Sequence, residues 1–581
     1  MRGIVKKYYK FILPYKGLFA VFISFVVISS ILDNLTPYFY KLFIENIPQE
    51  NWSFIYQILI VFVLTRIFAN WTHMISYYFS DKVLFPASRD ARLAVFRHIQ
   101  DLDFAYHINK NTGSLISAFK RGDGAFFNLF TSIHQDILSI IVNLAIVIFF
   151  FAKINLVLVG ILLVIILLIG SLGVGLIKAN IRKRVEFNEV EDNISGIITD
   201  NLLNYETVKF FAKERKEEDR LSFEFKDWFD KVWNYANSFR KIDLAVGTTV
   251  NIGILGIFYV AIRMLVSEAI SAGDFILIAG YIMSFFPRFF ELLFRFRSIA
   301  INYADIVKYL SILDNPILVK DPEDPKELKK IKGKIEFENV FFKYPDSKIN
   351  ILKDFSLVIK PGQSVAFIGK SGAGKTTIVK IILRFFDVIR GRVLIDGINI
   401  RELNKSSLRS YLGVVPQEPI LFNNTIAYNI AYGDDLIDMK KVIRATKLAN
   451  LHKFIMTLPE KYETQVGERG IKLSGGQKQR LAIARMMIVD PKIIIFDEAT
   501  SNLDSESEKL IQEAFWKVSK GKTVIIIAHR LSTVKKADKI VVLKKGRIVQ
   551  TGTHRQLRNK PGLYRHLWEL QSEREEEMLL R

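Results

Sequence analysis

The sequence contains no cysteine among its 581 residues. This absence excludes a disulfide-based scaffold, a thiolate metal site and a cysteine nucleophile, although it leaves the redox compartment open. The chain also lacks internal repeats and low-complexity tracts. Because half of its residues are hydrophobic, its composition is unlike that of a disordered or collagen-like chain. A chain of this length suggests more than one folded domain.

Two properties of the composition point to different classes of protein. Aromatic residues make up 13% of the chain, and 81 Lys and Arg stand against 59 Asp and Glu, a formal net charge of +22. Long hydrophobic runs lie within residues 1 to about 310, whereas the part from about 330 onward has the short Val and Ile runs of a soluble α/β domain. Strong positive charge alone permits a nucleic-acid-binding protein. The placement of that charge along the chain decides between this class and a membrane protein.

Six segments in the N-terminal half are apolar and long enough to cross a bilayer as helices, which takes roughly 20 residues. One such run could be a buried helix of a soluble protein, but six in succession favour a transmembrane domain. The first span is interrupted by Asp33 and Pro37, and the last carries charged residues near its end. The predicted spans are 16–43, 54–79, 133–153, 155–178, 245–268 and 274–297.

Lys and Arg are concentrated in two long connections, between the second and third spans and between the fourth and fifth. The other connections are short and almost free of them, so the positive-inside rule places both long loops and both termini in the cytoplasm. We therefore expect an integral, multi-pass protein of a bacterial inner (cell) membrane, with membrane lipids and no nucleic acid among its partners. The long loops keep helical periodicity, and we expect the segments 111–130 and 200–220 to dock on the soluble domain.

The strongest local motif is a strand, Ser364–Ile368, followed by a glycine-rich loop and a helix. It matches the GxxxxGK[ST] pattern in the strand–loop–helix context that phosphate binding needs. The glycines let backbone N–H groups turn toward phosphate oxygens, and the helix N-terminus adds positive potential. Lys375 is expected to reach the β- and γ-phosphates, and Thr376 to place its hydroxyl on Mg²⁺. The candidate nucleotide-binding residues here are Gly369, Ser371, Gly372, Ala373, Gly374, Lys375, Thr376 and Thr377.

A second motif, residues 493–500, is an apolar strand that ends in two acidic residues. Asp497 is placed to hold Mg²⁺, directly or through water, and Glu498 follows it and can polarise an attacking water. The alternative is a core strand with a solvated acidic end. The phosphate loop earlier in the chain makes that alternative the weaker interpretation.

A third motif, LSGGQ at residues 473–477, places Ser474, Gly475 and Gly476 at the start of a helix. Such a helix start binds anions, but the chain already has one phosphate loop. The second anion-binding helix start therefore needs a second phosphate, or the same phosphate approached from another subunit.

In their order and spacing, the phosphate loop, LSGGQ and the acidic strand end resemble the nucleotide-binding domain of an ABC transporter over about residues 340–565. Six spans before one such domain resemble an exporter-type half-transporter. The resemblance implies an α-helical transmembrane domain of six helices over 1–312, a linker over 313–335, and an α/β P-loop ATPase domain with a helical subdomain over 336–581. It also implies an ATP hydrolase that uses ATP and Mg²⁺ and exports cargo by alternating access as a dimer. A second copy of itself suffices as the partner, because every motif is intact, and a heterodimer with another half-transporter is the alternative.

The resemblance assigns roles to further single residues. Tyr344 matches the aromatic residue that stacks on adenine, and Gln417 matches the glutamine that contacts Mg²⁺ and senses the membrane domain. Asp504 lies in the loop that crosses between subunits, and His529 matches the histidine that contacts the γ-phosphate. The implied catalytic residues are Glu498, His529 and Gln417. The implied Mg²⁺ ligands are Thr376, Gln417 and Asp497. Besides the phosphate loop, the residues implied to bind ATP are Tyr344, Ser474, Gly475, Gly476, Gln477 and Asp504.

Charged residues in the spans indicate a candidate cargo pathway, because ionisable groups are costly in a membrane. Arg288, Glu291 and Arg295 share one helix face and could line a polar cavity with Arg66 and Asp33. A surplus of Arg there would favour an anionic or amphipathic cargo. The alternative is structural, with Arg288 paired to Glu291 and Arg295 reaching toward the inner interface.

The segment 204–214 resembles one found in mitochondrial and glutathione-conjugate exporters. Multidrug export and lipid flipping are the alternatives on the same scaffold. A soluble ABC ATPase, such as a DNA-repair or translation factor, would not carry six spans, and an importer usually keeps its spans and its ATPase on separate chains. A channel or receptor on this scaffold would not drive ATP-dependent uptake into inside-out vesicles.

Overall fold

The computed structural model describes residues 2–109, 112–328, 331–345, 347–467, 470, 472–497, 505–528 and 534–570. The chain forms two compact units. The helical unit comprises Met1–Asp101 and Asn111–Asn315, and the α/β unit comprises Leu102–Lys110 and Pro316–Arg581. A short insert from the N-terminal half therefore belongs to the α/β unit.

The helical unit consists mainly of long helices, as the hydrophobic runs predict. Among the described residues, five helical segments are long and apolar enough to cross a membrane: Gly3–Asn46, Trp52–Asp101, Leu115–Ile154, Leu156–Leu203 and Glu214–Val266. The sixth predicted span, 274–297, falls in a helix whose apolar described stretch is the shorter Ala272–Pro287. The helices of this unit are α1 (Arg2–Ile12), α2 (Lys16–Asp33), α3 (Thr36–Asn46), α4 (Trp52–Asp101), α6 (Thr112–Thr131), α7 (Leu138–Ile154), α8 (Leu156–Leu203), α9 (Tyr205–Phe210), α10 (Glu214–Val266) and α11 (Ala272–Ser311).

The first predicted span is divided into two helices, α2 and α3. The side-chain amide of Asn34, directly after α2, donates a hydrogen bond to the carbonyl of Ser30 at 2.6 Å. Pro37 lies in the first turn of α3, where its missing N–H leaves no intrahelical bond unmade. The interruption places the carboxylate of Asp33 at a helix end within the span.

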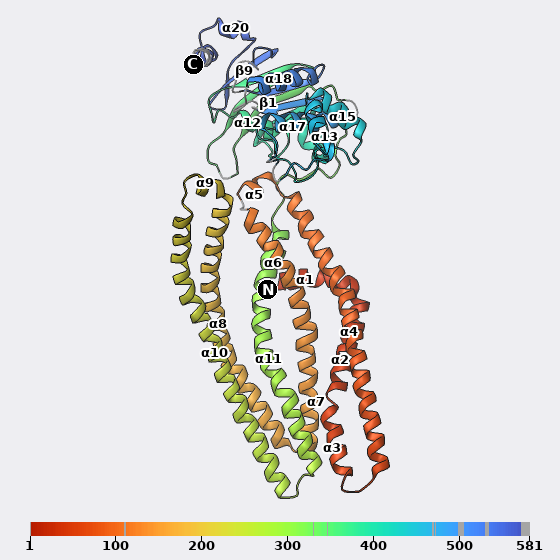
Figure 1. Cartoon of the computed structure of the whole chain (residues 1–581). Coiled ribbons are helices and arrows are strands. Elements are labelled where there is room, and N and C mark those ends of the chain that lie inside the picture. Colours follow the sequence, from red (N-terminus) through yellow and green to blue (C-terminus); the bar gives the residue numbers. More distant parts are fainter. Residues whose placement is uncertain are drawn as a thin grey trace. The chain divides into compact units, whose positions relative to one another are not determined.

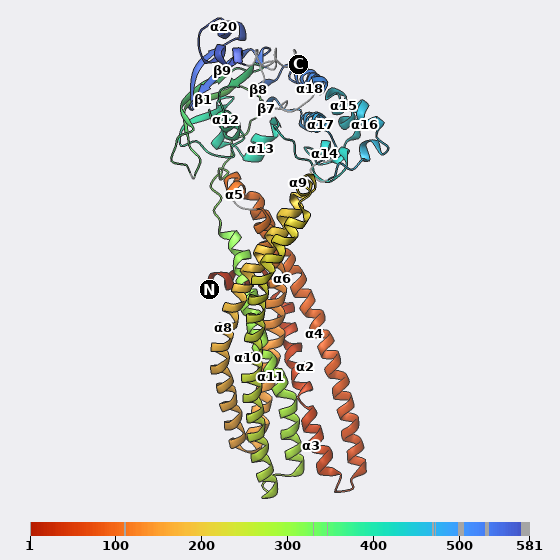
Figure 2. The same ribbon diagram turned by 60° about the vertical axis from the view of Figure 1, so that its left-hand side comes forward.

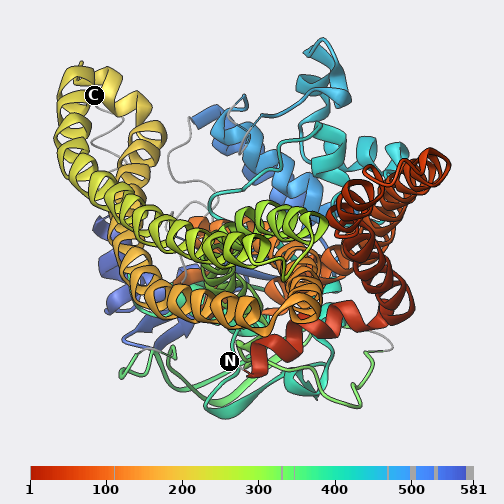
Figure 3. The same ribbon diagram turned by 90° about the horizontal axis from the view of Figure 1, so that it is seen from below.

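The long connections between spans are themselves helical. Helices α4 and α8 contain 50 and 48 residues, and 50 helical residues extend over roughly 75 Å, more than twice the ~30 Å hydrocarbon core of a bilayer. The helices that contain the second and fourth predicted spans thus extend well beyond them. Helices α8 and α10 run side by side (Figures 1 and 3). Gly253 permits this close approach, because a Cβ there would collide with the side chain of Ile165.

Two apolar cores hold the helical unit together. One lies among α7, α8, α10 and α11 and includes Leu162 and Ile257. The other joins α1, α2, α4, α6 and α11 and includes Phe22, Phe130 and Leu310, with the rings of Phe22 and Phe130 stacked at 5.6 Å. Helix α11 contributes to both cores and so connects them.

Two sheets form the framework of the α/β unit. The first has the strand order β2 (Leu352–Ile359), β1 (Ile335–Phe342), β4 (Arg390–Ile395), β5 (Ile398–Asn399) and is antiparallel. The second has the order β10 (Arg547–Gly552), β9 (Lys539–Lys544), β3 (Ser364–Ile368), β8 (Thr523–Ile527), β7 (Ile493–Asp497), β6 (Leu412–Val415). In the second sheet only β10 is antiparallel to its neighbour. Strands β3, β7 and β8 are buried almost throughout, as parallel strands covered on both faces are.

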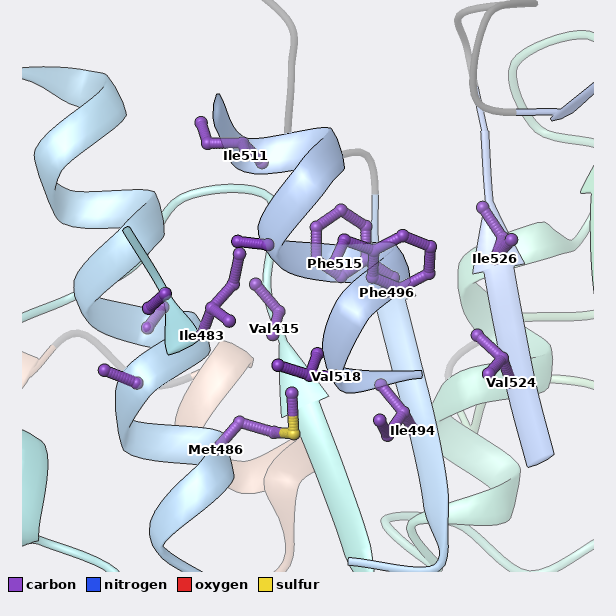
Figure 4. Packing of buried hydrophobic residues seen from close by; sticks show 14 of the residues in the cluster. Val415, Ile483, Met486, Ile494, Phe496, Ile511, Phe515, Val518, Val524 and Ile526 are labelled. Atoms are coloured by element: carbon purple, nitrogen blue, oxygen red, sulfur yellow. The ribbon is translucent and has the colours of Figure 1, made fainter. Parts of the chain in front are cut away.

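Helices pack on the second sheet and build a helical subdomain. The ring of Phe496 on β7 meets that of Phe515 on α18 at 4.2 Å, and Ile483 and Met486 of α17 lie near Val415 (Figure 4). Helices α14 to α17 gather on one side of this unit (Figure 2). The predicted fold class, a helical transmembrane region followed by an α/β ATPase domain with a helical subdomain, is thus confirmed. The helices of this unit are α5 (Phe104–Asn109), α12 (Lys375–Ile382), α13 (Lys405–Ser410), α14 (Ile426–Ala431), α15 (Met439–Leu448), α16 (His452–Thr457), α17 (Gly475–Ile488), α18 (Ser505–Val518) and α20 (His554–Arg558).

Candidate functional site

The predicted site residues follow the carboxyl ends of neighbouring parallel strands. Strands β3, β8, β7 and β6 are consecutive in the sheet, so the segments after them meet at one edge, where ligands of such sheets bind. The phosphate loop follows β3, Asp497 ends β7, and Gln417 comes just after β6. Glu498, Asp504 and His529 lie outside the described residues, and their roles stay predictions.

The phosphate loop joins β3 to α12. Gly372 and Gly374 have φ angles of +76° and +104°, a backbone conformation that residues with a Cβ rarely adopt. Gly369 lies against the carbonyl oxygen of Leu543, which leaves no room for a Cβ. Lys375 begins α12 and is buried, and its Nζ donates a hydrogen bond to the carbonyl of Gly369 at 2.8 Å. The loop thus curls around an ammonium group at the positive end of a helix, as an anion site requires.

The other residues of this motif differ in exposure. Ser371 and Thr376 are exposed, so their hydroxyls can reach a ligand at the loop, whereas Ala373 is buried. Thr377 is buried and shares a hydrogen bond of 3.1 Å with the hydroxyl of Tyr344. The predicted adenine-stacking residue is therefore joined directly to the phosphate-binding helix.

Asp497, at the end of β7, has an environment suited to a cation. Burial raises the pKa of its carboxyl, and the ammonium groups of Lys375 and Lys380 offset part of that rise. With the hydroxyl of Thr376 and the amide of Gln417 it offers the oxygen donors that Mg²⁺ prefers, so these residues fit an ion shared with phosphates. In the part of the chain that the structure describes, no group of three or more His, Cys, Asp or Glu side chains forms another metal site.

Helix α17 begins within the LSGGQ motif, as predicted. Ser474 caps it: its hydroxyl accepts a hydrogen bond from the backbone N–H of Gln477 at 3.3 Å, and the side-chain oxygen of Gln477 accepts one from the N–H of Ser474 at 2.9 Å. Gly476 lies so close to α18 that a Cβ would collide with it. Farther along α17, Gln479 donates a hydrogen bond to the backbone carbonyl of Gln417 at 2.5 Å. Helix α17, which starts in the LSGGQ motif, is therefore linked to the backbone at Gln417.

The α/β unit includes α5, a helix from the N-terminal half of the chain. The ring of Phe104 stacks on that of Phe385, with centroids 4.6 Å apart and planes at 13°. The Nζ of Lys380 lies over the rings of Phe104 and Tyr344, at 5.4 and 5.5 Å. Docking of 111–130 on the soluble domain stays a prediction: within the helical unit α6 packs on α11, whereas the residues just before it, Leu102–Lys110, belong to the α/β unit. No pattern in the sequence around Phe104 indicated that it contacts the α/β unit.

A polar cavity of about 210 Å³ lies inside the helical unit. It brings together three of the five predicted pathway residues, namely Asp33, Glu291 and Arg295. Sequence reasoning missed Asp136 and His73, which also line the cavity. A signal for Asp136 was present, because an ionisable residue within a predicted span indicates a functional or paired position.

Two carboxylates of this cavity, those of Asp33 and Asp136, are paired with a guanidinium of another helix. Arg295 lies 3.2 Å from the carboxylate of Asp136. Arg66, which does not line the cavity, donates a hydrogen bond to Asp33 at a distance of 2.9 Å. Arg295 therefore pairs with a neighbouring helix, whereas the side chain of Arg288 lies outside the described part of the structure. The described lining carries three carboxylates and one guanidinium, so it does not show the predicted surplus of Arg.

The motifs and the two units define an ATP-binding domain joined to a transmembrane domain. Residues 352–501 match the family described as ABC transporter, and residues 19–289 match the ABC transporter transmembrane region. The chain belongs to the ABC transporter family, and its architecture is that of an exporter-type half-transporter. It binds ATP and couples ATP hydrolysis to export across a membrane.

Similar proteins come from bacteria and eukaryotes. The Bacillus subtilis (strain 168) ATP-binding/permease protein YgaD, named for multidrug export, is 33% identical over 583 residues, which cover 98% of this chain and 100% of YgaD. The human ATP-binding cassette sub-family B member 6 is 35% identical over 490 residues, or 84% of this chain, and the chain spans only 58% of that protein's length. A solved bacterial Atm1-family ABC exporter with ATP bound is 31% identical, with a TM-score of 0.82 and 98% of both chains covered.

Proposed function

We propose that two copies of this chain form a dimer that exports cargo by alternating access, with two ATP molecules bound between the α/β units. The observation that carries this proposal is that one chain has one phosphate loop and one LSGGQ helix start, and that both are intact. Each is an anion-binding helix start. If the LSGGQ of one copy faces the phosphate loop of the other, both helix starts bind the same nucleotide.

In each ATP site the residues of the chain have separate roles. The phosphate loop and Lys375 bind the phosphates, and Tyr344 stacks on adenine. Glu498 orients and polarises the attacking water, while His529 contacts the γ-phosphate. Asp504 and the LSGGQ residues reach the site from the second copy. The family membership and the curled geometry of the phosphate loop support this assignment.

Thr376, Asp497 and Gln417 would hold Mg²⁺. When bound, the ion supplies positive charge to the oxygens of the phosphates. The raised pKa of Asp497 supports this placement, because a carboxylate that burial destabilises gains most from a nearby cation.

The conformational cycle follows from the chain connections. ATP binding draws the two α/β units together, and hydrolysis lets them separate. Helix α5 belongs to the α/β unit and moves with it, so α4 and α6, the helices on either side of α5 in the chain, carry the movement into the helical unit. Helix α9 exposes 58% of Tyr205 and 80% of Phe210, which supports a docking contact with the second copy.

The polar cavity supports a cargo pathway within the helical unit. Carboxylates outnumber the guanidinium among its described lining residues, and Glu291 and His73 add polar groups that can face a ligand. We therefore favour an amphipathic cargo whose polar group is cationic or zwitterionic over a purely anionic one.

A lipid is the second candidate cargo, and one observation favours it. Helices α8 and α10 form an apolar groove of about 680 Å³ in which Gly160 and Gly256 leave space between larger aliphatic side chains. An acyl chain fits such a groove within a bilayer. Movement of a fluorescent phospholipid between the leaflets of liposomes, dependent on ATP, would distinguish a flippase from an exporter of soluble amphiphiles.

We place the protein in a bacterial cell membrane with the α/β unit in the cytoplasm. The concentration of Lys and Arg in the two long loops supports this orientation. The full-length similarity to YgaD and to a bacterial exporter supports a bacterial membrane, although similar proteins also occur in eukaryotes.

The variant Glu498→Gln tests the proposed mechanism. In the reconstituted protein we expect it to bind ATP normally and to release phosphate at least about a hundredfold more slowly, the contribution of a general base. Glu506→Gln, a conversion of an exposed glutamate at the start of α18, is the control and is expected to hydrolyse ATP normally. Normal phosphate release from Glu498→Gln contradicts the proposed role of Glu498.

A further inference from the structure

A pocket beside Tyr344 is built partly by the loop between the second and third predicted spans. It has a volume of about 440 Å³ and is lined by Ala105 and Ile108 of α5, by Tyr344 and Ser347, and by Lys380 and Phe386. This volume lies within the range of about 300–1,000 Å³ typical of small-molecule sites. We propose that α5 forms one wall of the adenine pocket, with Ala105 and Ile108 in contact with the base. The proposal rests on the assignment of Tyr344 as the adenine-stacking residue.

Helix α5 is fixed in place from both sides, so it can serve as a rigid wall. The ring of Phe104 stacks on Phe385, directly after α12. The carboxylate of Asp103, just before α5, accepts hydrogen bonds from the backbone N–H groups of Leu318 and Val319, the latter at 3.1 Å. Two independent contacts thus hold a helix of only six residues against the α/β unit.

The walls of the pocket suit a flat aromatic ring with apolar faces. The rings of Tyr344 and Phe386 meet edge to face at 5.2 Å and form one side. Ile108 on the facing helix leaves 57% of its surface exposed in a pocket that is otherwise largely aromatic or apolar. A base stacked on an aromatic residue gains about 1–3 kcal/mol, and Ile108 would cover part of the base from another side. A purine therefore covers apolar surface that α5 leaves open.

Lys380 connects this pocket to the phosphate loop and to α5 at once. Its ammonium lies over both Phe104 and Tyr344, and it belongs to α12, the helix that begins with Lys375. A base that packs against Tyr344 therefore also lies near the ammonium of Lys380, which makes a cation–π contact with Phe104. In this arrangement ATP contacts α5 through its base, whereas a bare triphosphate contacts only the phosphate loop.

The test compares ATP with inorganic triphosphate, which has no base, as ligands of the full-length protein in nanodiscs. Ala105→Trp fills the pocket from α5 and is expected to weaken ATP binding at least about tenfold, equivalent to about 1.4 kcal/mol. Ile108→Ala is expected to weaken it about threefold, because less apolar surface is covered. Both variants are expected to bind inorganic triphosphate as the wild type does. Ile437→Ala, which truncates another half-exposed isoleucine of the α/β unit, is the matched control and leaves both affinities unchanged.

Tyr344→Ala separates this proposal from the assignment on which it rests. If Tyr344→Ala weakens ATP binding while both α5 variants bind ATP normally, α5 is not a wall of the base pocket, although Tyr344 keeps its role. If Tyr344→Ala binds ATP normally, the base binds elsewhere and both ideas fail. Equal weakening of ATP and triphosphate binding by Ala105→Trp and Ile108→Ala also overturns the proposal, because it shows a loss of phosphate-site structure and not of base contact.

Discussion

Arg66 of α4 donates a hydrogen bond from Nη1 to Oδ1 of Asp33 at 2.9 Å. Asp33 is the last residue of α2, where the negative end of the helix dipole disfavours a carboxylate. The guanidinium compensates for this repulsion and joins α4 to the break between α2 and α3. The pair therefore helps to position one side of the polar cavity, which Asp33 lines.

Arg66→Met is expected to lower the free energy of unfolding by about 1 kcal/mol, because it removes the partner of Asp33 from an ion pair that is only partly buried, with 42% and 29% of the two side chains exposed. The double variant Arg66→Met, Asp33→Asn leaves no charge unpaired and is expected to recover most of that stability. Thermal unfolding in detergent measures both. A double variant no more stable than Arg66→Met alone would show that the pair does not act as one unit.

Glu291→Gln tests the charge preference of the cavity. We expect the concentration of a cationic amphiphile that half-maximally stimulates ATP hydrolysis to rise about tenfold, as expected for the loss of one charge-assisted contact. An anionic amphiphile of the same chain length is the matched ligand control. Asp305→Asn, which removes a carboxylate of α11 that does not line the cavity, is the matched variant. Equal weakening of both amphiphiles by Glu291→Gln argues against a cationic polar group on the cargo.

Asp497→Asn is expected to stabilise the protein while abolishing hydrolysis. Burial raises the folded-state pKa of Asp497 above its unfolded value, so ionising it costs stability as the pH rises through the folded pKa. At pH 7, without Mg²⁺ or nucleotide, the variant is expected to melt about 2 °C higher, the shift for a change of ~1 kcal/mol in a domain of this size. The gain is expected to shrink as the pH falls toward that pKa.

Asp490→Asn is the opposite-sign control for this experiment. Its hydrogen bond with Lys522 lowers the pKa of Asp490, so its ionised form contributes to stability at neutral pH. The variant is expected to melt at or below the wild-type temperature, with a small effect because the side chain is largely exposed. A difference in melting temperature between Asp497→Asn and the wild type that does not change with pH would refute the account of its burial.

Gly372→Ala and Gly397→Ala separate backbone strain from ligand binding. Both glycines have positive φ, +76° and +84°, and a Cβ on either would meet no atom within 4 Å. Each substitution is expected to cost about 1–2 kcal/mol of stability, because side chains disfavour this conformation. Only Gly372 lies in the phosphate loop, so only Gly372→Ala is expected to weaken ATP binding as well, which isothermal titration of the full-length protein measures. Equal ATP affinities for the two variants would place the phosphates away from Gly372.

The local motifs could be predicted from the sequence because neighbouring residues determine them. The strand before Gly369, the helix that starts at Lys375 and the buried strand that ends at Asp497 all lie where their patterns place them. The break near Asn34 was also visible, because Asp33 and Pro37 interrupt an apolar run.

Contacts between distant segments could not be predicted in this way. The stacking of Phe104 on Phe385 joins residues far apart in the chain, and α5 is too short to show a helical period. For the same reason the sequence left open whether Arg295 lines a cavity or reaches the interface, and it did not show that Asp136 from another helix is its partner. The sequence showed that these charges were unusual but not which groups they meet.

The central claim is that each ATP site combines elements of two copies, and mixing two inactive variants tests it most directly. Lys375→Ala damages the phosphate loop and Gly475→Asp damages the LSGGQ helix start, so neither variant alone is expected to hydrolyse ATP. Co-expressed in one membrane, they form mixed dimers in which one site joins both damaged elements and the other joins two intact ones. We predict that hydrolysis recovers to about a quarter of the wild-type rate, because half of the dimers carry one of two sites. Hydrolysis that stays at the level of the separate variants would contradict the shared site.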